Sequence, residues 1–376
     1  MSFGRRVDRP LRVLLVDPST HGGISLYSSL VARALVACGA RPTLLGSRAL
    51  AQELQPYEVK RLLPRLQWGR PTRAGPRFYA GRAWGWGASA VVLLALAALR
   101  RPEVIHFQAP LNRRLDAALV RLVRRLAPVV WTAHDVVPFD RTAADAARFA
   151  AIYRAVDLVL VHGETAAAEV RALAGVEAAV VDHVAPEPLV DATREEARRR
   201  LALPSGRILA ALGLIRRYKG YRLLAEVWEN LGEQAPLLLV MGEVMDESER
   251  PTLERLQRTG RAVVRPGYAS NVDLQLAVLA SDALVLPYVE SSESGVLHQA
   301  RALGVPVLAS DVPQLAASVR STAAGRILPI DVAAWSAAVT ETLPPPPPPP
   351  PTADQIGRAH VAAYEAARRR GQAGRQ

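Results

Sequence analysis

The sequence has a single cysteine, Cys38, among 376 residues, and only 5% of its residues are aromatic. One cysteine excludes an internal disulfide framework and a multi-cysteine zinc site, and it fits a reducing compartment. Long apolar runs are also missing, because the longest, residues 87–99, falls short of the about 20 residues that a membrane-spanning helix needs. We expect that run to form a buried helix. The first apolar stretch, residues 11–16, ends at Asp17 and predicts a first strand, not a signal peptide.

Lysine is nearly absent, since 45 of the 47 basic residues are arginine and the two lysines are Lys60 and Lys219. The formal net charge is +12, and residues 1–187 carry +10 of it, from 25 basic and 15 acidic side chains. A basic half favours an anionic partner such as nucleic acid, anionic lipid or a phosphorylated substrate. A general enrichment in arginine is the alternative explanation. Half of the residues are apolar, which excludes general disorder.

Short runs rich in valine and leucine alternate with helical stretches along the whole chain. Continuous apolar strands between helices predict an α/β fold with parallel sheets covered on both faces. Twelve strands exceed one sheet, so we predict two Rossmann-like, doubly wound domains of about six strands each. The twelve runs are residues 11–16, 41–45, 104–107, 129–132, 158–161, 179–181, 207–211, 236–241, 262–264, 283–286, 306–309 and 326–328.

Prolines mark the predicted boundaries. Pro186 and Pro188 interrupt the pattern, so we place a first domain at residues 1–187 and a second at 188–343. Residues 344–351 are eight consecutive prolines, which must form extended polyproline II. This run is a rigid connector or, alternatively, a docking site for an SH3- or WW-like module. Residues 352–376 then form a C-terminal helix.

Polar groups gather where the first-domain strands end. Gly22 and Gly23 lie between a strand and a helix, where backbone N–H groups can approach a phosphate or sugar, although a tight turn explains them equally. His106 and His134 sit at the ends of two strands, which is where open α/β sheets bind ligands. A strand-end histidine is as often structural. No third ligand is evident, so a metal is not expected.

Two segments of the second domain resemble anion sites. Arg216 and Lys219 are three residues apart at the start of a helix near Gly220, so both cations and the helix N-terminus can face one diphosphate. A departing nucleoside diphosphate needs such preorganised positive charge. Further along, a strand ends at Leu286 and a helix begins near Ser294. The intervening serines can bind sugar hydroxyls, or they merely cap the helix.

In this order, over about residues 10–340, the segments resemble the retaining glycosyltransferases of the GT-B fold, the group that includes sucrose and mannosyl transferases. The motifs are the glycine pair Gly22-Gly23, Thr132-Ala-His134-Asp135 for T-x-H, Gly213-Leu-Ile-Arg216-Arg-Tyr-Lys219-Gly220 for G-x-x-R-x-x-K-G, and Ser294 to Val307 for the E-A-x-A-x-G-x-P-V helix.

The resemblance implies a reaction and a set of residues. A sugar moves from a nucleotide-diphosphate sugar to a glycan or lipid-linked acceptor with retention of configuration, without a metal or any other cofactor. It also implies that the two domains face each other across a cleft, with the acceptor on the first and the donor on the second, and that the C-terminal helix, residues 352–376, crosses back to the first domain. His134, Arg216 and Lys219 are the implied catalytic residues, and His106 and Asp135 lie on the acceptor side. The implied donor-binding residues are Gly22, Gly23, Gly213, Ser292, Glu293, Ser294, Gly295, Val296 and Gln299.

One motif departs from the family. Its two glutamates are replaced by Ser291 and Gln299, and Glu290 and Glu293 flank the first of these positions. An amide at residue 299 still hydrogen-bonds a ribose hydroxyl, but without a charge. A glutamine and a serine here leave two alternatives open: a sugar-nucleotide epimerase of the GT-B fold that uses the loop glutamates, and a non-catalytic relative that binds a glycan or nucleotide.

The sequence does not specify the acceptor. The resemblance implies a role in polysaccharide biosynthesis at the cell envelope. The stretch from Leu111 to Leu126 predicts a helix with leucines on one face and arginines elsewhere. Such helices dock related transferases on anionic membranes, although a core helix with a solvated arginine face fits too. We therefore expect a cytoplasmic protein, peripheral at the inner face of the membrane. Nucleic acid is not an expected partner, because interleaved aromatics, zinc ligands and a docking motif are missing.

Overall fold

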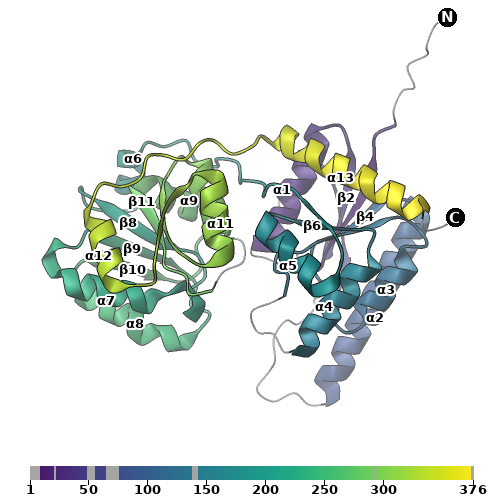
Figure 1. Cartoon of the computed structure of the whole chain (residues 1–376), viewed down its shortest axis with the longest axis horizontal. Helices are drawn as coiled ribbons and strands as arrows, with labels where there is room; N and C mark the ends of the chain where they lie inside the picture. The colour runs from purple at the N-terminus through teal and green to yellow at the C-terminus, as the bar shows by residue number, and fades with distance from the viewer. Residues whose placement is uncertain are drawn as a thin grey trace, which may run out of the picture. The chain divides into compact units, whose positions relative to one another are not determined.

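The computed structural model describes residues 9–20, 23–48, 56–64, 76–137, 143–290 and 294–373. The chain divides into two compact units (Figure 1). Unit 1 contains residues 1–184 and 351–376, and unit 2 contains residues 185–350. The division falls after Val184, close to the boundary after residue 187 that was predicted from the prolines. The C-terminal helix belongs to unit 1.

Unit 1 has a sheet of seven parallel strands in the order β3-β2-β1-β4-β5-β6-β7. The strands are β1 (Arg12–Asp17), β2 (Arg41–Ser47), β3 (Glu58–Leu63), β4 (Val104–Phe107), β5 (Val129–Thr132), β6 (Leu158–Val161) and β7 (Ala178–Val180). The helices are α1 (Gly23–Ala37), α2 (Pro76–Arg100), α3 (Asp116–Val123), α4 (Ala143–Ala155), α5 (Glu164–Ala174) and α13 (Ala353–Ala373).

Unit 2 has a sheet of six parallel strands in the order β10-β9-β8-β11-β12-β13. The strands are β8 (Ile208–Leu212), β9 (Leu237–Gly242), β10 (Ala262–Pro266), β11 (Ala283–Leu286), β12 (Val307–Ser310) and β13 (Gly325–Leu328). The helices are α6 (Arg194–Arg200), α7 (Tyr221–Leu231), α8 (Arg250–Arg258), α9 (Asn271–Ala280), α10 (Gly295–Ala302), α11 (Pro313–Thr322) and α12 (Val332–Thr340), with 3-10 turns η1 (Arg217–Lys219), η2 (Gly232–Gln234) and η3 (Glu247–Glu249).

The predicted fold class is confirmed: both units are Rossmann-like, with helices on both faces of a parallel sheet. All twelve predicted strands are present, and their ends shift by at most two residues. The sequence missed β3 at the edge of the first sheet, because Glu58, Lys60 and Arg61 interrupt the apolar run that marks a buried strand.

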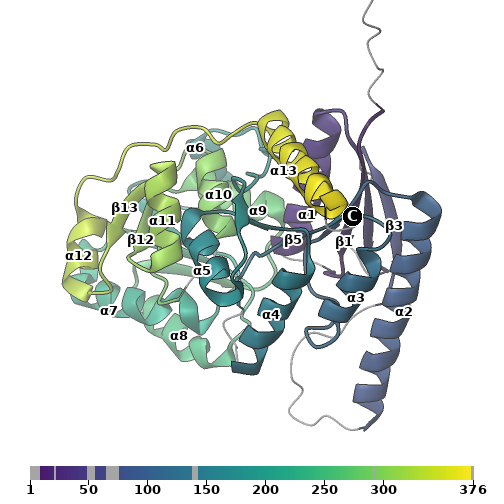
Figure 2. The same ribbon diagram turned by 45° about the vertical axis from the view of Figure 1, so that its right-hand side comes forward.

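Each sheet separates two layers of apolar side chains. In β1, Val13 and Leu15 join one core with α1 and α13, whereas Leu14 and Val16 join the other core with the helices α2 to α5. This alternation is the two-residue period of a strand buried on both faces. Helix α13 therefore completes the layer that α1 begins, and the two helices lie side by side in Figures 1 and 2.

Two predicted helices differ from the structure. The apolar run 87–99 lies within α2, but only its side with Ala90, Leu93, Leu96 and Ala97 is buried, so the helix is half-buried and not buried as predicted. By length and composition alone, the stretch Ala80–Arg100 is also apolar enough to span a membrane. The helix predicted from Leu111 to Leu126 is confined to α3, because flanking turns end it on both sides.

The proline run packs with a period of three. Pro347 is buried, Pro344, Pro350 and Pro351 are half-buried, and Pro345, Pro346, Pro348 and Pro349 are exposed. A polyproline II helix has three residues per turn, so one of its edges lies on the protein and the others face solvent. Just before the run, Arg207 donates hydrogen bonds to the carbonyls of Thr340 and Glu341, both at 2.8 Å, which fixes where the run begins.

Close packing of α13 on α1 gives the first prediction. A Cβ on Gly357 would lie 2.1 Å from the Ala34 carbonyl oxygen, whereas a Cβ on Gly87 in α2 meets nothing within 4 Å. Gly357→Ala should therefore lower the free energy of unfolding by about 1–3 kcal/mol. The matched Gly87→Ala should raise it by about 0.5–1 kcal/mol, since alanine favours a helix. Urea unfolding followed by circular dichroism checks both, and equal effects of the two changes would contradict the close contact.

Candidate functional site

The strand order of unit 2 reverses between β8 and β11, which are hydrogen-bonded neighbours. Parallel strands end at one edge of the sheet, and the loops that leave a reversal point diverge and open a ligand site there. The loop after β8 is residues 213–220, and the loop after β11 leads from Pro287 to Ser294. The fold therefore brings together the two second-domain segments that the sequence singled out.

Backbone contacts lock these two loops to each other. Gly220 has φ +74°, and a Cβ on it would lie 1.8 Å from the carbonyl oxygen of Pro287. Only glycine fits there, for both its left-handed conformation and the space. The amide of Val289 also donates a 2.8 Å hydrogen bond to the carbonyl of Tyr218.

Lys219 is buried between the loops. Its Nζ lies 3.4 Å from the Leu212 carbonyl oxygen, to which it donates, and 5.0 Å from the centre of the Tyr288 ring. A cation over an aromatic face is stabilised there without being neutralised. Arg216 is half-buried, and its Nε has no hydrogen-bond partner among the residues that the structure describes. Two positive side chains are thus held on one loop, ready for an anion.

Two helices begin at this site. No side chain caps α7 after Gly220, so its first N–H groups are available to a ligand. At α10, the Ser294 hydroxyl accepts from the amide of Leu297, and a Cβ on Gly295 would meet nothing within 4 Å. Helix N-termini carry partial positive charge and favour phosphate. Together with Lys219 and Arg216 they make a strongly anion-attracting surface.

Of the other predicted donor residues, Gly213 lies close to both Val296 and Lys219. A Cβ on Gly213 would lie 3.3 Å from Val296 Cγ2 and 3.4 Å from Lys219 Nζ. Gln299 is buried on α10, and Glu290 is exposed. Gly22, Ser292 and Glu293 lie outside the described residues, as does Ser291.

In unit 1, His134 follows β5 and is half-buried against Tyr27, with ring centres 4.7 Å apart and ring planes at 87°. Its Nε2 atom is buried and has no hydrogen-bond partner within the described part of the chain. Burial, and to a lesser extent the neighbouring His162, lowers the pKa of His134 to about 3. The ring is therefore neutral near pH 7 and is a weak base. Gly23 opens α1, and Asp135 follows His134.

His106 does not fit the acceptor-side role that was expected from the sequence. The ring is completely buried and hydrogen-bonded through both nitrogens, to Tyr364 Oη at 2.8 Å and to Thr132 Oγ1 at 2.7 Å. Burial lowers its pKa well below the usual value. His106 is a structural residue of the core, which is the other reading that a strand-end histidine allows.

Sequence reasoning missed several residues of both sites. In unit 2 it missed Tyr288, which directly follows the Leu286-Pro strand end and lies beneath Lys219. In unit 1 it missed His162 and His183, which also follow strand ends, and Tyr27, which contacts both rings. The strand-end position of each histidine was a usable signal, whereas the contact with a helix residue far away in sequence was not.

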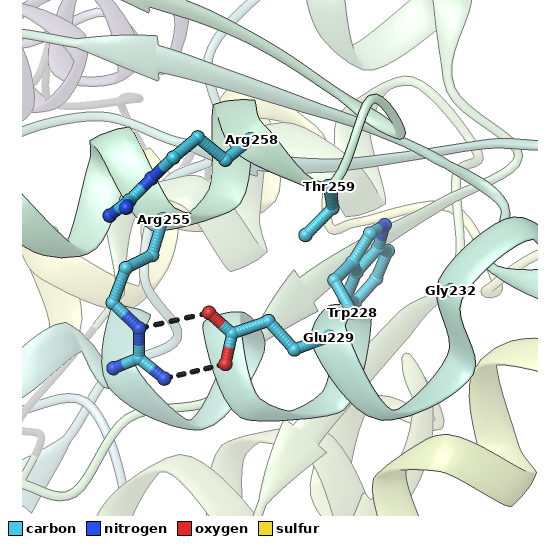
Figure 3. Close-up of a pocket in the computed structure, with 6 residues that line it drawn as sticks. All are labelled: Trp228, Glu229, Gly232, Arg255, Arg258 and Thr259. Carbon is cyan, nitrogen blue, oxygen red and sulfur yellow. Dashed lines mark hydrogen bonds and ion pairs between the residues drawn. The ribbon is translucent and has the colours of Figure 1, made fainter.

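A groove of about 510 Å³ lies elsewhere in unit 2, at the C-terminal end of α7 (Figure 3). Arg255 and Glu229 form a two-pronged ion pair across it, at 2.9 and 2.7 Å. Arg255 is thereby neutralised, and the groove is at the opposite end of α7 from the loop 213–220. Over the residues that the structure describes, no group of three histidine, cysteine or acidic side chains is arranged to hold a metal ion.

Comparison with known families matches successive parts of the chain. A model described as Glycosyltransferase Family 4 matches residues 21–186, and one described as Glycosyl transferases group 1 matches residues 206–344. A mannosylfructose-phosphate synthase of Agrobacterium fabrum is 32% identical over 32% of this chain and 29% of its own length. A Bacillus subtilis protein named as the teichuronic acid biosynthesis glycosyltransferase TuaC is 28% identical over 68% of this chain and 65% of its own. The matches thus span less than two thirds of either relative.

Solved structures share the fold over nearly the whole chain. A sucrose-phosphate synthase from Thermosynechococcus elongatus superposes with a TM-score of 0.67 at 20% identity, covering 96% of this chain and 94% of the other. Anabaena HepE in complex with UDP and glucose gives a TM-score of 0.61 at 13% identity, covering 96% and 97%.

The buried histidines predict how stability depends on pH. The pKa of His134 is lowered to about 3 and that of His360 to about 4 from 6.5, in both cases mainly by burial. Because the folded pKa lies below the unfolded one, the stabilisation is complete above pH 6.5 and is lost as the pH falls. We expect the free energy of unfolding to decrease from pH 6.5 to about 4.5, above the usual carboxylate range.

Urea unfolding at several pH values in that interval measures the slope. The double variant His134→Gln, His360→Gln should flatten it, because these two rings no longer take up protons on unfolding. A slope equal to that of the unmodified protein would show that other groups cause the effect.

Proposed function

Since this chain belongs to the group 1 glycosyltransferases of the GT-B fold, we propose that it transfers a sugar from a nucleotide-diphosphate sugar to a glycan or lipid-linked acceptor, with retention of configuration. The observation that carries the proposal is the pair Arg216 and Lys219 beside the uncapped N-terminus of α7. The UDP and glucose in the Anabaena structure support a nucleotide sugar as the donor class.

Departure of the diphosphate is the step that these cations assist. The bond between the anomeric carbon and the diphosphate oxygen breaks, and the electron pair leaves with the diphosphate. Arg216 and Lys219 stabilise the charge that develops there, so no metal ion is required for this purpose. The acceptor hydroxyl attacks from the same face and gives its proton to the departing diphosphate. Lys219 is held by Leu212 and Tyr288 before the reaction begins, so little reorganisation is needed.

His134 takes a different part. Its neutral ring, with a pKa lowered to about 3 by burial, is unsuited to act as a base. The ring is only half-buried, so its accessible edge is instead available to contact the donor sugar. Gln299 fits an uncharged contact to the ribose, as expected from the replacement of the glutamate at that position.

Nucleotide binding tests the donor site. We expect one of UDP, GDP, ADP and TDP to bind, and Lys219→Met to weaken it at least about tenfold, because a hydrogen-bonded charge near phosphate is worth about 1.5–3 kcal/mol. Arg217→Met is the matched control, since Arg217 is the exposed neighbour in the same turn. Isothermal calorimetry measures both. Equal losses in the two variants would contradict the site.

Turnover separates the proposed transferase from its alternatives. Transfer from the labelled sugar nucleotide to an acceptor supports the enzyme, whereas tight nucleotide binding without product indicates a non-catalytic relative. An epimerised sugar nucleotide would point to the epimerase.

A membrane surface is the proposed location of the acceptor. Exposed apolar side chains run along α2: Trp84 is 77% exposed, Val91 66% and Leu99 81%. Residues 59–102, which include α2, hold nine basic residues and no acidic one. Exposed tryptophan and leucine beside arginine are typical of helices that lie in the interface of an anionic bilayer.

Helix α3 extends this surface. It lies next to α2 in Figure 2, and the Trp86 indole of α2 donates to Asp116 of α3 at 3.3 Å. Leu115, Leu122 and Leu126 are 40–45% exposed, whereas Leu119 is buried. The membrane contact predicted for the stretch from Leu111 to Leu126 is therefore proposed for α2 and α3 together. We place the protein in the cytoplasm, at the inner face of the membrane.

Vesicle sedimentation checks this surface. The protein should sediment with phosphatidylglycerol vesicles and much less with phosphatidylcholine vesicles. Val91→Asp should reduce binding at least about tenfold, since one buried apolar side chain contributes about 1.5–3 kcal/mol. Ile330→Asp, at a 48% exposed position of unit 2, is the control and should bind normally. Sedimentation that ignores lipid charge, or equal behaviour of both variants, would contradict the proposal.

A further inference from the structure

Tyr27 of α1 lies at the centre of a group of imidazole rings in unit 1. Its side chain is buried, and its ring centre is 4.7 Å from His134, 5.0 Å from His162 and 4.9 Å from His183. Edge-to-face contacts between such rings are favourable and depend on orientation. The position of the His134 ring is therefore set in part by a residue from a different element, more than a hundred positions earlier in the chain.

The C-terminal helix α13 reaches Tyr27 through His360. The Nδ1 of His360 donates to the Ile356 carbonyl at 2.9 Å, so its Nε2 carries the lone pair in the neutral ring. That Nε2 lies 3.4 Å from the Tyr27 hydroxyl, which donates to it. Burial lowers the pKa of His360 to about 4, which keeps this arrangement neutral near pH 7.

A second connection runs from α13 to the strand that carries His134. Tyr364, one helical turn after His360, is hydrogen-bonded to His106 Nδ1 at 2.8 Å. The other nitrogen of His106 is bonded to Thr132 Oγ1 at 2.7 Å. Thr132 is the last residue of β5 and stands two positions before His134. Both connections thus start on α13; the first ends at the His134 ring and the second at Thr132, two residues before it.

Helix α13 itself is firmly held in unit 1. Gly357 packs directly on the backbone of α1, and Arg368 pairs with Glu103 at 3.2 Å. Ile356, Tyr364 and Ala367 are buried in the core that α1 and β1 share. A helix fixed this way can transmit a definite position to the residues that it contacts.

We propose that α13 and Tyr27 are positioning elements for His134, so that the C-terminal segment of the chain sets the orientation of this ring. The proposal rests on the role given to His134 under the proposed function. Through the ring of Tyr27 and through the Tyr364, His106 and Thr132 hydrogen bonds, α13 sets the orientation of the His134 ring. Misplacing a group in a catalytic site by about 1 Å is enough to reduce the rate up to about a hundredfold.

The test uses full-length variants that remove single groups. Tyr27→Leu removes the ring, Tyr27→Phe restores the ring without the hydroxyl, and Tyr364→Phe removes only the hydroxyl that binds His106. Tyr57→Phe is the matched control, because Tyr57 is also a buried tyrosine of unit 1 whose hydroxyl bonds to α1, at Ser29 over 2.7 Å. It contacts neither His134 nor α13 through any bond that the structure describes.

Two readouts are measured. In the sugar transfer reaction, Tyr27→Leu should lower kcat at least about tenfold and leave the donor KM within about twofold. Tyr27→Phe, which keeps the ring but loses the bond to His360, should recover only part of the loss. Tyr364→Phe should lower kcat several-fold. Independently of activity, nitrogen-15 NMR of the histidine rings should show a changed His134 signal in Tyr27→Leu and Tyr364→Phe, with His134→Gln identifying the signal.

The Tyr57→Phe control distinguishes a specific effect on His134 from general destabilisation. If Tyr57→Phe changes kcat and the His134 signal as much as Tyr364→Phe does, the effects are general destabilisation and the proposal is overturned. An unchanged His134 signal in Tyr27→Leu and Tyr364→Phe overturns it as well. A changed signal in a protein that binds no sugar nucleotide would refute the proposed function and leave the coupling between α13 and His134 standing.

Discussion

The contact between Gly220 and the Pro287 carbonyl is the constraint on which the candidate donor site depends. The carbonyl occupies the place of a side chain, so two backbones touch where the loops after β8 and β11 meet. This contact places Lys219 over Tyr288 and leaves the N-terminus of α7 without a side-chain cap. Positive charge is then fixed in a partly buried position, where it attracts an anion more strongly than a mobile surface lysine would.

Unit 1 differs from unit 2, because its buried polar rings carry no charge. Desolvation holds His106, His134 and His360 neutral, and each is surrounded by aromatic rings or hydrogen-bonding groups. Neutral imidazole has one donor and one acceptor nitrogen, so a network of such rings has a defined direction. The same burial that makes His134 a poor base makes its orientation definite. In unit 2 the Leu212 carbonyl and the Tyr288 ring stabilise a buried charge, whereas in unit 1 burial keeps the rings neutral.

The sequence predicted the strands well, since an apolar run bounded by turns is a local signal. It missed β3, whose charged residues lie at a sheet edge, and it misjudged α2, because apolar composition does not say which face is covered. The loop 213–220 was predicted because its residues are adjacent in sequence. Tyr288 beneath Lys219, and Tyr27 and Tyr364 beside the histidines, were not, since only folding brings these residues together.

The dependence of nucleotide affinity on the number of phosphates tests the anion site at Arg216 and Lys219 most directly. Binding of the preferred nucleoside diphosphate and of its monophosphate is compared by calorimetry in the presence of EDTA. The diphosphate should bind at least about tenfold more tightly, since the second phosphate gains the charge-assisted contacts with Arg216 and Lys219 and no metal is needed. Equal affinity for the two nucleotides, or binding that EDTA abolishes, would contradict that site.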